Sequence, residues 1–236
     1  MRSLFLRPAL AWGVHLFTAS GAVWGLLSIL AIFERNWRAA IIWMILAVLV
    51  DGFDGMLARW ADVKTYAPGI DGALLDNILD YLNYVLVPAL FLTQAEALLP
   101  AKFRLAGGVL ILLASAYQFT QSDAKTDDYY FKGFPSYWNI MVLYMLVLGW
   151  NPWLNLALLV FFALLVFVPV KYIYPSRNTR LRQLTLILTY LYAVLGIWAA
   201  MQYPHVPVWA VWVTLVYVAY YAALSLWPRE RIPEHA

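Results

Sequence analysis

The sequence predicts an all-α protein that crosses a membrane several times. Of its 236 residues, 64% are hydrophobic, and the mean hydropathy is +0.71. Soluble domains contain about 45–50% apolar residues, so this composition indicates a polytopic membrane protein. We expect one transmembrane catalytic domain, residues 1–236, with no separate soluble part. The absence of cysteine excludes disulfides, thiol nucleophiles and cysteine metal sites, and the net charge of +3 gives no reason to expect a nucleic-acid partner.

Eight apolar segments are long enough, or nearly so, to span about 30 Å of hydrocarbon. Their approximate ranges are 9–33, 38–59, 70–97, 103–120, 137–150, 152–172, 183–202 and 207–227. The fifth is short, and Asn151-Pro152 separates it from the sixth by a tight turn. The first runs on to Phe33, further than the apolar part of a signal peptide, so we interpret it as a retained helix.

The charges between these segments predict how the protein is oriented. If the N-terminus is inside, twelve Lys and Arg residues lie on the cytoplasmic side and four on the other, Arg35, Arg38, Lys102 and Arg104. This distribution satisfies the positive-inside rule. Both termini and the connection 60–71 between the second and third helices then face the cytoplasm.

Four carboxylates lie in the apolar second and third segments. Asp51 and Asp54 are three residues apart, and Asp76 and Asp80 are four apart, so each pair shares one face of a helix. An intramembrane carboxylate is costly unless it faces a cavity, a cation or a partner. Because hard cations prefer oxygen ligands, one or two divalent cations would relieve the repulsion among the four groups. Such a site suits a phosphate substrate.

Small and basic residues accompany the aspartates. Gly55 and Gly72 carry no side chain, which allows another group to approach the backbone closely. Arg59 adds a fixed positive charge suited to a phosphate. In the first segment, Gly13, Gly21 and Gly25 form a small-residue face for helix packing.

The pattern Asp51-x2-Asp54-Gly55-x2-Ala58-Arg59-x12-Gly72-x3-Asp76-x3-Asp80 resembles the signature of the CDP-alcohol phosphotransferases. These integral membrane enzymes move a phosphoryl-linked group from a CDP-activated donor to an alcohol. The gap of twelve residues between Arg59 and Gly72 is longer than in most members. In this it is similar to the bacterial phosphatidylcholine synthases, which join CDP-diacylglycerol to choline.

The resemblance implies a role for each position of the motif. Asp51, Asp54 and Asp76 would hold a divalent cation, Mg²⁺ or Mn²⁺, and Asp80 would complete a second site and act as general base. The residues that would bind the nucleotide and its diphosphate are Gly55, Ala58, Arg59 and Gly72. The resemblance also implies a homodimer and a location in the bacterial inner membrane. Because the chain has no Cys and no Ser-His-Asp order that would suggest a covalent intermediate, direct displacement by the acceptor is favoured.

The first segment adds a further pair, His15 and Thr18. Many family members have Asn-x-x-Thr near this point, lining the nucleotide site, and His15-x-x-Thr18 has the same spacing with His in place of Asn. The alternative is that both residues only bond a neighbouring helix.

The connection 116–139 mixes acidic and aromatic residues and is similar to a stretch of the phosphatidylcholine synthases. We interpret it as an amphipathic segment on the bilayer. Because aromatic faces attract quaternary ammonium groups, it could help to enclose choline; an ordinary interfacial loop is the alternative. The candidates for the choline pocket are Tyr84, which follows Asp80 by one turn, and Tyr129, Tyr130, Tyr137 and Trp138.

The densest basic cluster, residues 171–183, follows the sixth segment. Anchoring to anionic lipid headgroups explains it without a site, but the resemblance favours Arg177 or Arg180 as a ligand of the donor's diphosphate.

Two other functional interpretations remain open, a different acceptor and a transporter. Glycerol phosphate, inositol phosphate or serine could replace choline, although phosphorylated acceptors need basic residues that helices two to five largely lack. A cation transporter would show inverted repeats with broken helices, and none is visible.

Overall fold

A computed structural model describes residues 2–124, 130–173 and 181–227, with side chains from Leu6 onward. Its elements in chain order are α1 (Arg2–Phe33), α2 (Trp37–Trp60), α3 (Val63–Tyr66), α4 (Gly72–Asp80), the π-helix η1 (Tyr81–Leu86), α5 (Val87–Gln94), the 3₁₀-helix η2 (Ala101–Phe103), α6 (Arg104–Thr120), β1 (Tyr130–Lys132), α7 (Trp138–Leu148), α8 (Pro152–Leu165), β2 (Lys171–Ile173), α9 (Arg182–Met201) and α10 (Val208–Leu226).

The predicted all-α membrane class is confirmed. Within the described residues, six helical runs are long and apolar enough to cross a membrane: Leu6–Phe33, Trp37–Trp60, Gly72–Gln94, Ala101–Thr120, Arg182–Met201 and Val208–Leu226. The other two predicted segments form the shorter helices α7 and α8, of 11 and 14 residues. The sixth segment is shorter than its apolar run 152–172 because the chain turns after Leu165 and enters β2.

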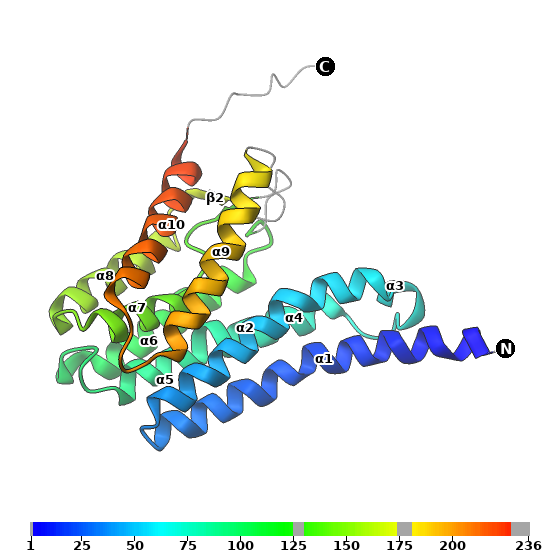
Figure 1. Cartoon of the computed structure of the whole chain (residues 1–236), viewed down its shortest axis with the longest axis horizontal. Helices are drawn as coiled ribbons and strands as arrows, with labels where there is room; N and C mark the ends of the chain where they lie inside the picture. The colour runs from blue at the N-terminus through cyan, green and yellow to red at the C-terminus, as the bar shows by residue number, and fades with distance from the viewer. Residues whose placement is uncertain (1, 125–129, 174–180, 228–236) are drawn as a thin grey trace.

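The helices form two groups that diverge (Figure 1). The antiparallel pair α1 and α2 turns at residues 34–36, and α4 packs against α1. The antiparallel pair α9 and α10 is inclined to them. Ala200 of α9 packs with Ile41 and Ile45 of α2, and from there the two helices separate toward the N-terminal end of α9 (Figure 1). This divergence leaves the C-terminal half of α2, which carries Asp51, away from that contact.

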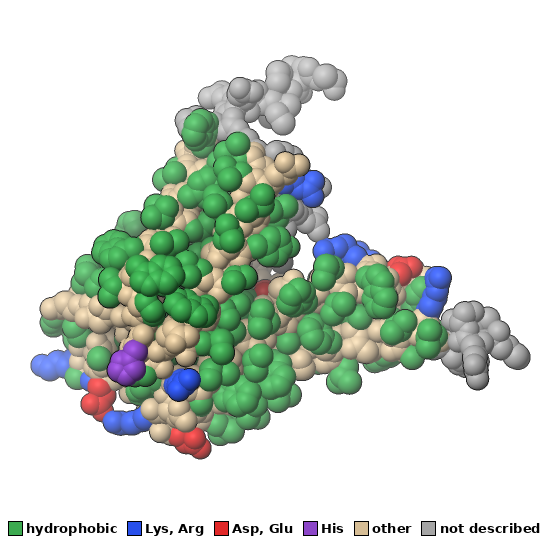
Figure 2. All heavy atoms as spheres, viewed as in Figure 1, with side chains coloured by type: hydrophobic (Ala, Val, Ile, Leu, Met, Phe, Trp, Pro, Cys, Tyr) green, Lys and Arg blue, Asp and Glu red, His purple; other side chains and the backbone are tan. Residues whose placement is uncertain are grey.

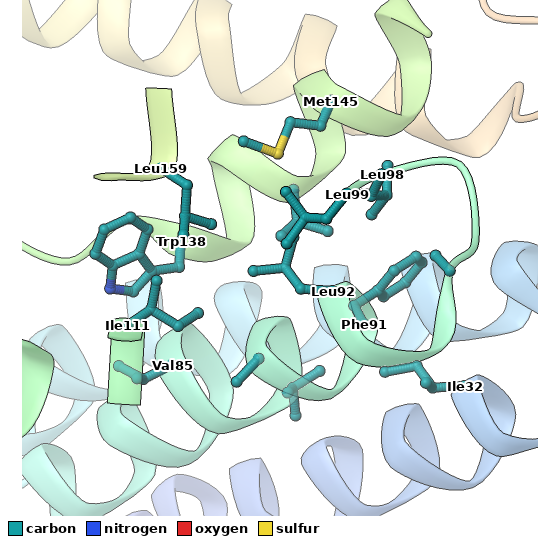
Figure 3. Packing of buried hydrophobic residues seen from close by; sticks show 14 of the residues in the cluster. Ile32, Val85, Phe91, Leu92, Leu98, Leu99, Ile111, Trp138, Met145 and Leu159 are labelled. Carbon is teal, nitrogen blue, oxygen red and sulfur yellow. The ribbon is translucent and has the colours of Figure 1, made fainter. Parts of the chain in front are cut away.

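The main core lies among α5, α6, α7 and α8 (Figure 3). Trp138 is fully buried there with Phe91, Ile111 and Leu159. Its indole Nε1 donates a hydrogen bond to Ser115 Oγ at 2.7 Å. Trp138 is therefore a core residue with a satisfied polar atom, and we correct its assignment to the choline pocket.

The connection that the sequence indicated as a bilayer-surface segment forms other structure. The α6 helix continues to Thr120, and β1 pairs antiparallel with β2, with Phe131 opposite Tyr172. The turn that follows β1 requires glycine, since Gly133 has a φ of +78° and an added Cβ would lie 2.3 Å from the carbonyl oxygen of Val166. This small sheet ties the α6–α7 connection to the α8–α9 connection.

Candidate active site

Three of the four predicted carboxylates come together between α2 and α4. Asp51, Asp76 and Asp80 each offer an oxygen, and these oxygens lie within 4.8 Å of one another. The spacing of four residues puts Asp76 and Asp80 on one face of α4, and that face is turned toward Asp51 of α2. All three side chains are half-buried. Carboxylate oxygens at this separation are a suitable donor set for a hard divalent cation.

Asp54 lines the same cavity but is held differently. It is buried, hydrogen-bonded by the Thr18 side chain and by the backbone of Gly55, and it lies outside the close group of three. The resemblance implied that Asp54 would join Asp51 and Asp76 in the first cation site. In the structure Asp80 is the third member of that group, and the Thr18 side chain is hydrogen-bonded to Asp54.

The cavity enclosed by the aspartates is small, about 10 Å³. A volume of this size accommodates about one water-sized sphere. Asn83 and Tyr84 of η1 complete its lining, together with the apolar side chains of Val50 and Leu79. The size and the donor set both fit a cation bound by Asp51, Asp76 and Asp80.

Tyr84 contacts the carboxylate group directly. Its phenolic hydroxyl donates a hydrogen bond of 2.6 Å to Asp51 Oδ2. The sequence placed Tyr84 near Asp80, because four residues separate them on one helix, but it did not indicate this bond to α2. The bond fixes one carboxylate oxygen of Asp51 and leaves the other for a ligand.

Packing of α1 against η1 fixes the position of the third span, Gly72–Gln94, along α1. Asn83 Nδ2 donates to the carbonyl oxygen of Gly21 at 3.2 Å, and an added Cβ on Gly25 would lie 2.6 Å from Asn83 Oδ1. The glycine face of α1 is thus occupied by Asn83 at Gly21 and Gly25. Gly13 has no neighbour within 4 Å of an added Cβ and does not share this contact.

The N-terminus of α4 is fixed by Asp71, which is not one of the four carboxylates predicted for the site. Asp71 Oδ1 accepts hydrogen bonds from the backbone N–H groups of Ala73 and Leu74, both at 3.0 Å. This is an N-cap, which satisfies two of the unpaired donors at a helix start. Asp71 therefore defines where α4 begins, which sets the positions of Asp76 and Asp80.

His15 and Gly72 lie against each other. His15 is 5% exposed, and its Cε1 lies 3.4 Å from the position of an added Cβ on Gly72. Its buried Nε2 atom has no hydrogen-bond partner, although buried polar atoms nearly always have one. The close approach expected at Gly72 is therefore made by His15, and Nε2 remains available to a ligand.

Arg59 and Ala58 complete the motif on α2. Arg59 is exposed and Ala58 half-buried. The Arg59 Nη1 atom lies 3.5 Å from the position of an added Cβ on Gly55. The guanidinium thus extends back along the helix toward the aspartates, over the residue that carries no side chain.

The candidate choline residues separate into different environments. Trp138 is in the core, and the ring of Tyr130 on β1 already faces a cation, with Lys171 Nζ 5.9 Å from its centroid. Asp123, an acidic residue of the same connection, is paired with Lys132 at 2.5 Å. Tyr137 is the N-cap of α7, and Phe134 packs near its ring. Tyr129, Arg177 and Arg180 lie outside the described residues.

An acidic side chain is visible where the α9–α10 pair meets the α2–α4 pair (Figure 2), amid a surface that is largely hydrophobic. A carboxylate is therefore accessible from the angle between the two groups of helices.

A membrane helix bundle with carboxylates grouped on two neighbouring helices has a donor set that could hold a divalent cation, as a phosphotransferase acting within the membrane would need. The chain belongs to the CDP-alcohol phosphatidyltransferase family, whose sequence profile matches residues 15–170. The resemblance stated from the motif is thus confirmed.

Its curated relatives are more specific. A phosphatidylcholine synthase of Legionella pneumophila is 44% identical over 223 residues, which cover 92% of this chain and 88% of that protein. One of Borreliella burgdorferi is 43% identical, covering 76% of each chain. One of Pseudomonas aeruginosa is 36% identical and covers 96% of this chain and 94% of its own length.

Proposed function

We propose that the chain is a phosphatidylcholine synthase, which transfers the phosphatidyl group of CDP-diacylglycerol to choline and releases CMP. The carboxylate group of Asp51, Asp76 and Asp80 inside a membrane domain carries the proposal, because a lipid-linked diphosphate needs its negative charge neutralised at that depth. The relatives named phosphatidylcholine synthase, matched over most of their length, support choline as the acceptor.

Asp51, Asp76 and Asp80 would hold a divalent cation, Mn²⁺ or Mg²⁺, and Asp54 would contribute to a second site. The family depends on divalent cations in general, and oxygen-only donors suit both metals. When bound, such a cation stabilises negative charge on the diphosphate and on the departing nucleotide.

Asp80 is the proposed general base. The choline hydroxyl oxygen attacks the phosphorus that carries diacylglycerol, and its proton passes to the Asp80 carboxylate. The bond between that phosphorus and the bridging oxygen of CMP breaks, and CMP leaves with the bonding electrons. One direct displacement completes the transfer without a covalent enzyme intermediate.

The cytidine diphosphate head would lie along α1, α2 and α4. His15 Nε2 supports this assignment because it is buried without a partner, and Arg59 because its charge lies over Gly55. Gly55, Ala58 and Gly72 would line the path, and Thr18 would act through Asp54. Arg177 or Arg180 would meet the lipid phosphate.

The location and assembly are part of the same proposal. The active site and both termini would face the cytoplasm of a bacterial inner membrane, where CDP-linked donors are made, and the enzyme would work as a homodimer surrounded by membrane lipids.

The test uses purified protein in mixed micelles with Mn²⁺, CDP-diacylglycerol and radiolabelled choline. We expect labelled phosphatidylcholine and an equal amount of CMP. Asp80→Asn should still bind CDP-diacylglycerol but lose turnover, whereas Asp71→Asn, which keeps the oxygen that caps α4, should remain active. If serine, inositol or glycerol 3-phosphate is a faster acceptor than choline, the proposed acceptor is wrong and only the family assignment stands.

A further inference from the structure

Four tyrosines from separate parts of the fold form a connected group, and one of them reaches the aspartates. Tyr84 comes from η1, Tyr137 precedes α7, Tyr192 is on α9 and Tyr221 is on α10. Tyr84 is bonded to Asp51, which connects the group to the candidate active site. All four side chains are half-buried.

Tyr137 lies at the centre of the group. Its side chain lies near those of Tyr84 and Tyr192 and is hydrogen-bonded to that of Tyr221. The Tyr221 hydroxyl also donates to the carbonyl oxygen of Ile173 in β2 at 3.1 Å. This hydrogen bond to β2 fixes the position of the Tyr221 side chain, which is the member of the group that α10 contributes.

Other aromatic residues hold the α9 side. The Tyr192 ring stacks on Tyr217, with centroids 4.5 Å apart and an interplanar angle of 27°, and its hydroxyl is hydrogen-bonded to Tyr144 of α7. The Tyr217 hydroxyl bonds to Thr189 at 2.8 Å. These contacts use one face of the Tyr192 ring and the hydroxyl groups of Tyr192 and Tyr217. They fix the orientation of both rings through uncharged groups.

We propose that Tyr84, Tyr137, Tyr192 and Tyr221 form the binding site for the quaternary ammonium group of the acceptor. This inference rests on the proposed function. A quaternary ammonium has no N–H to donate, so it is bound by the electron-rich faces of aromatic rings and by nearby negative charge. The four tyrosine rings supply the aromatic faces, and Asp51 and Asp80 supply the negative charge.

The shape of choline agrees with this position. Only two carbon atoms separate its hydroxyl from its nitrogen, so the ammonium must bind close to the base that accepts the proton. Tyr84 follows Asp80 by one helical turn and is bonded to Asp51. A choline with its hydroxyl at Asp80 would place its ammonium beside Tyr84 and the rings around Tyr137.

The test separates ring faces from hydroxyl groups. Tyr192→Leu and Tyr221→Leu remove a ring, whereas Tyr192→Phe and Tyr221→Phe keep it and lose only the hydroxyl. We expect each Leu variant to raise the KM for choline about 2- to 30-fold, the range of one cation–π contact, with the KM for CDP-diacylglycerol unchanged. The Phe variants should remain within about two-fold of the unmodified enzyme. Tyr190→Leu, on the exposed side of α9, is the matched control and should change neither constant.

Tetramethylammonium provides a second readout, because it has the charged group of choline without the hydroxyl. It should inhibit competitively against choline, and its inhibition constant should rise with the choline KM in the Leu variants. If the Phe variants lose as much as the Leu variants, or if tetramethylammonium inhibits all of them equally, the tyrosines only join the helices and the inference is wrong. An unmodified enzyme that does not use choline would instead overturn the proposed function.

Discussion

A single phenolic hydroxyl joins the third span to the carboxylate of the second. Tyr84 donates to Asp51 Oδ2 at 2.6 Å, and a hydrogen bond to a charged acceptor is stronger than one between neutral groups. A group that does not touch the metal but hydrogen-bonds to a metal-ligating carboxylate orients that carboxylate toward the ion. Tyr84 therefore has two proposed roles, since its hydroxyl positions Asp51 while its ring face is available to the acceptor.

Replacing Tyr84 by Phe separates these roles, because the ring remains. We expect Mn²⁺ affinity to fall about 10-fold or more, as for the loss of other partners of metal ligands, while the KM for choline changes little. Titration of bound Mn²⁺ by electron paramagnetic resonance measures the affinity independently of turnover. Tyr81→Phe is the control, because the Tyr81 hydroxyl bonds to the Leu112 carbonyl oxygen at 2.9 Å and not to an aspartate. Equal Mn²⁺ affinities in both variants would remove Tyr84 from the metal site.

Trp138 gives the opposite case, an aromatic residue whose role is packing. It is fully buried, and its indole bonds to Ser115. Truncation of a buried aromatic residue to Ala costs about 3–5 kcal/mol, so Trp138→Ala should lower the thermal unfolding temperature of the protein in detergent markedly. The protein that stays folded should have an unchanged KM for choline. A selective rise in that KM, without loss of stability, would return Trp138 to the acceptor site.

At the scale of elements, the packing of the π-helical turn η1 depends on α1 having no side chain at Gly25. Gly25→Ala should destabilise the bundle by about 1–3 kcal/mol, because the new methyl would lie 2.6 Å from Asn83 Oδ1. Displacement of Asn83 would also move Asp80, three residues before it, so activity should fall. Gly13→Ala has open space around it and should be neutral in thermal unfolding and in turnover. Equal stability of the two variants would contradict the packing described for η1.

The sequence predicts what local geometry determines. Aspartates at helical spacings in two apolar segments are enough to predict a shared carboxylate site, and the long spans follow from hydropathy. Contacts between distant segments leave no such pattern. The strands β1 and β2 have three residues each, too few to show alternation. In the sequence, Tyr192 and Tyr221 are ordinary aromatic residues of membrane helices, and only the fold brings them near Tyr137.

The same limit applies to His15 and Thr18. Their types and spacing suggest two members of one binding site, but only the structure shows that Thr18 is engaged by Asp54 while His15 faces Gly72. Helical spacing defines which residues share a face. It does not define which neighbour that face meets.

The whole molecule has a polar end that matches its proposed chemistry. Asp51 and Asp54 lie in the C-terminal half of α2, and Asp76 and Asp80 lie in the half of the span Gly72–Gln94 that is nearest the 60–71 connection. Arg7 of α1 bonds to Tyr66 of that connection at 2.7 Å. At the other end, Arg35 pairs with Glu96 at 3.0 Å. The two ends are thus chemically distinct, and only the first is close to the carboxylates.

The absence of cysteine from the chain allows the orientation to be tested without background labelling. Thr65→Cys and Lys102→Cys place one thiol at each end, both at exposed positions. If the aspartate end is cytoplasmic, a membrane-impermeant maleimide added to intact spheroplasts should label Lys102→Cys at once and Thr65→Cys only after lysis. The positive-inside rule favours this result, since more Lys and Arg residues flank the Thr65 end. Labelling of Thr65→Cys in intact spheroplasts would put the active site on the outer face, away from the supply of CDP-diacylglycerol, and would contradict the proposed orientation.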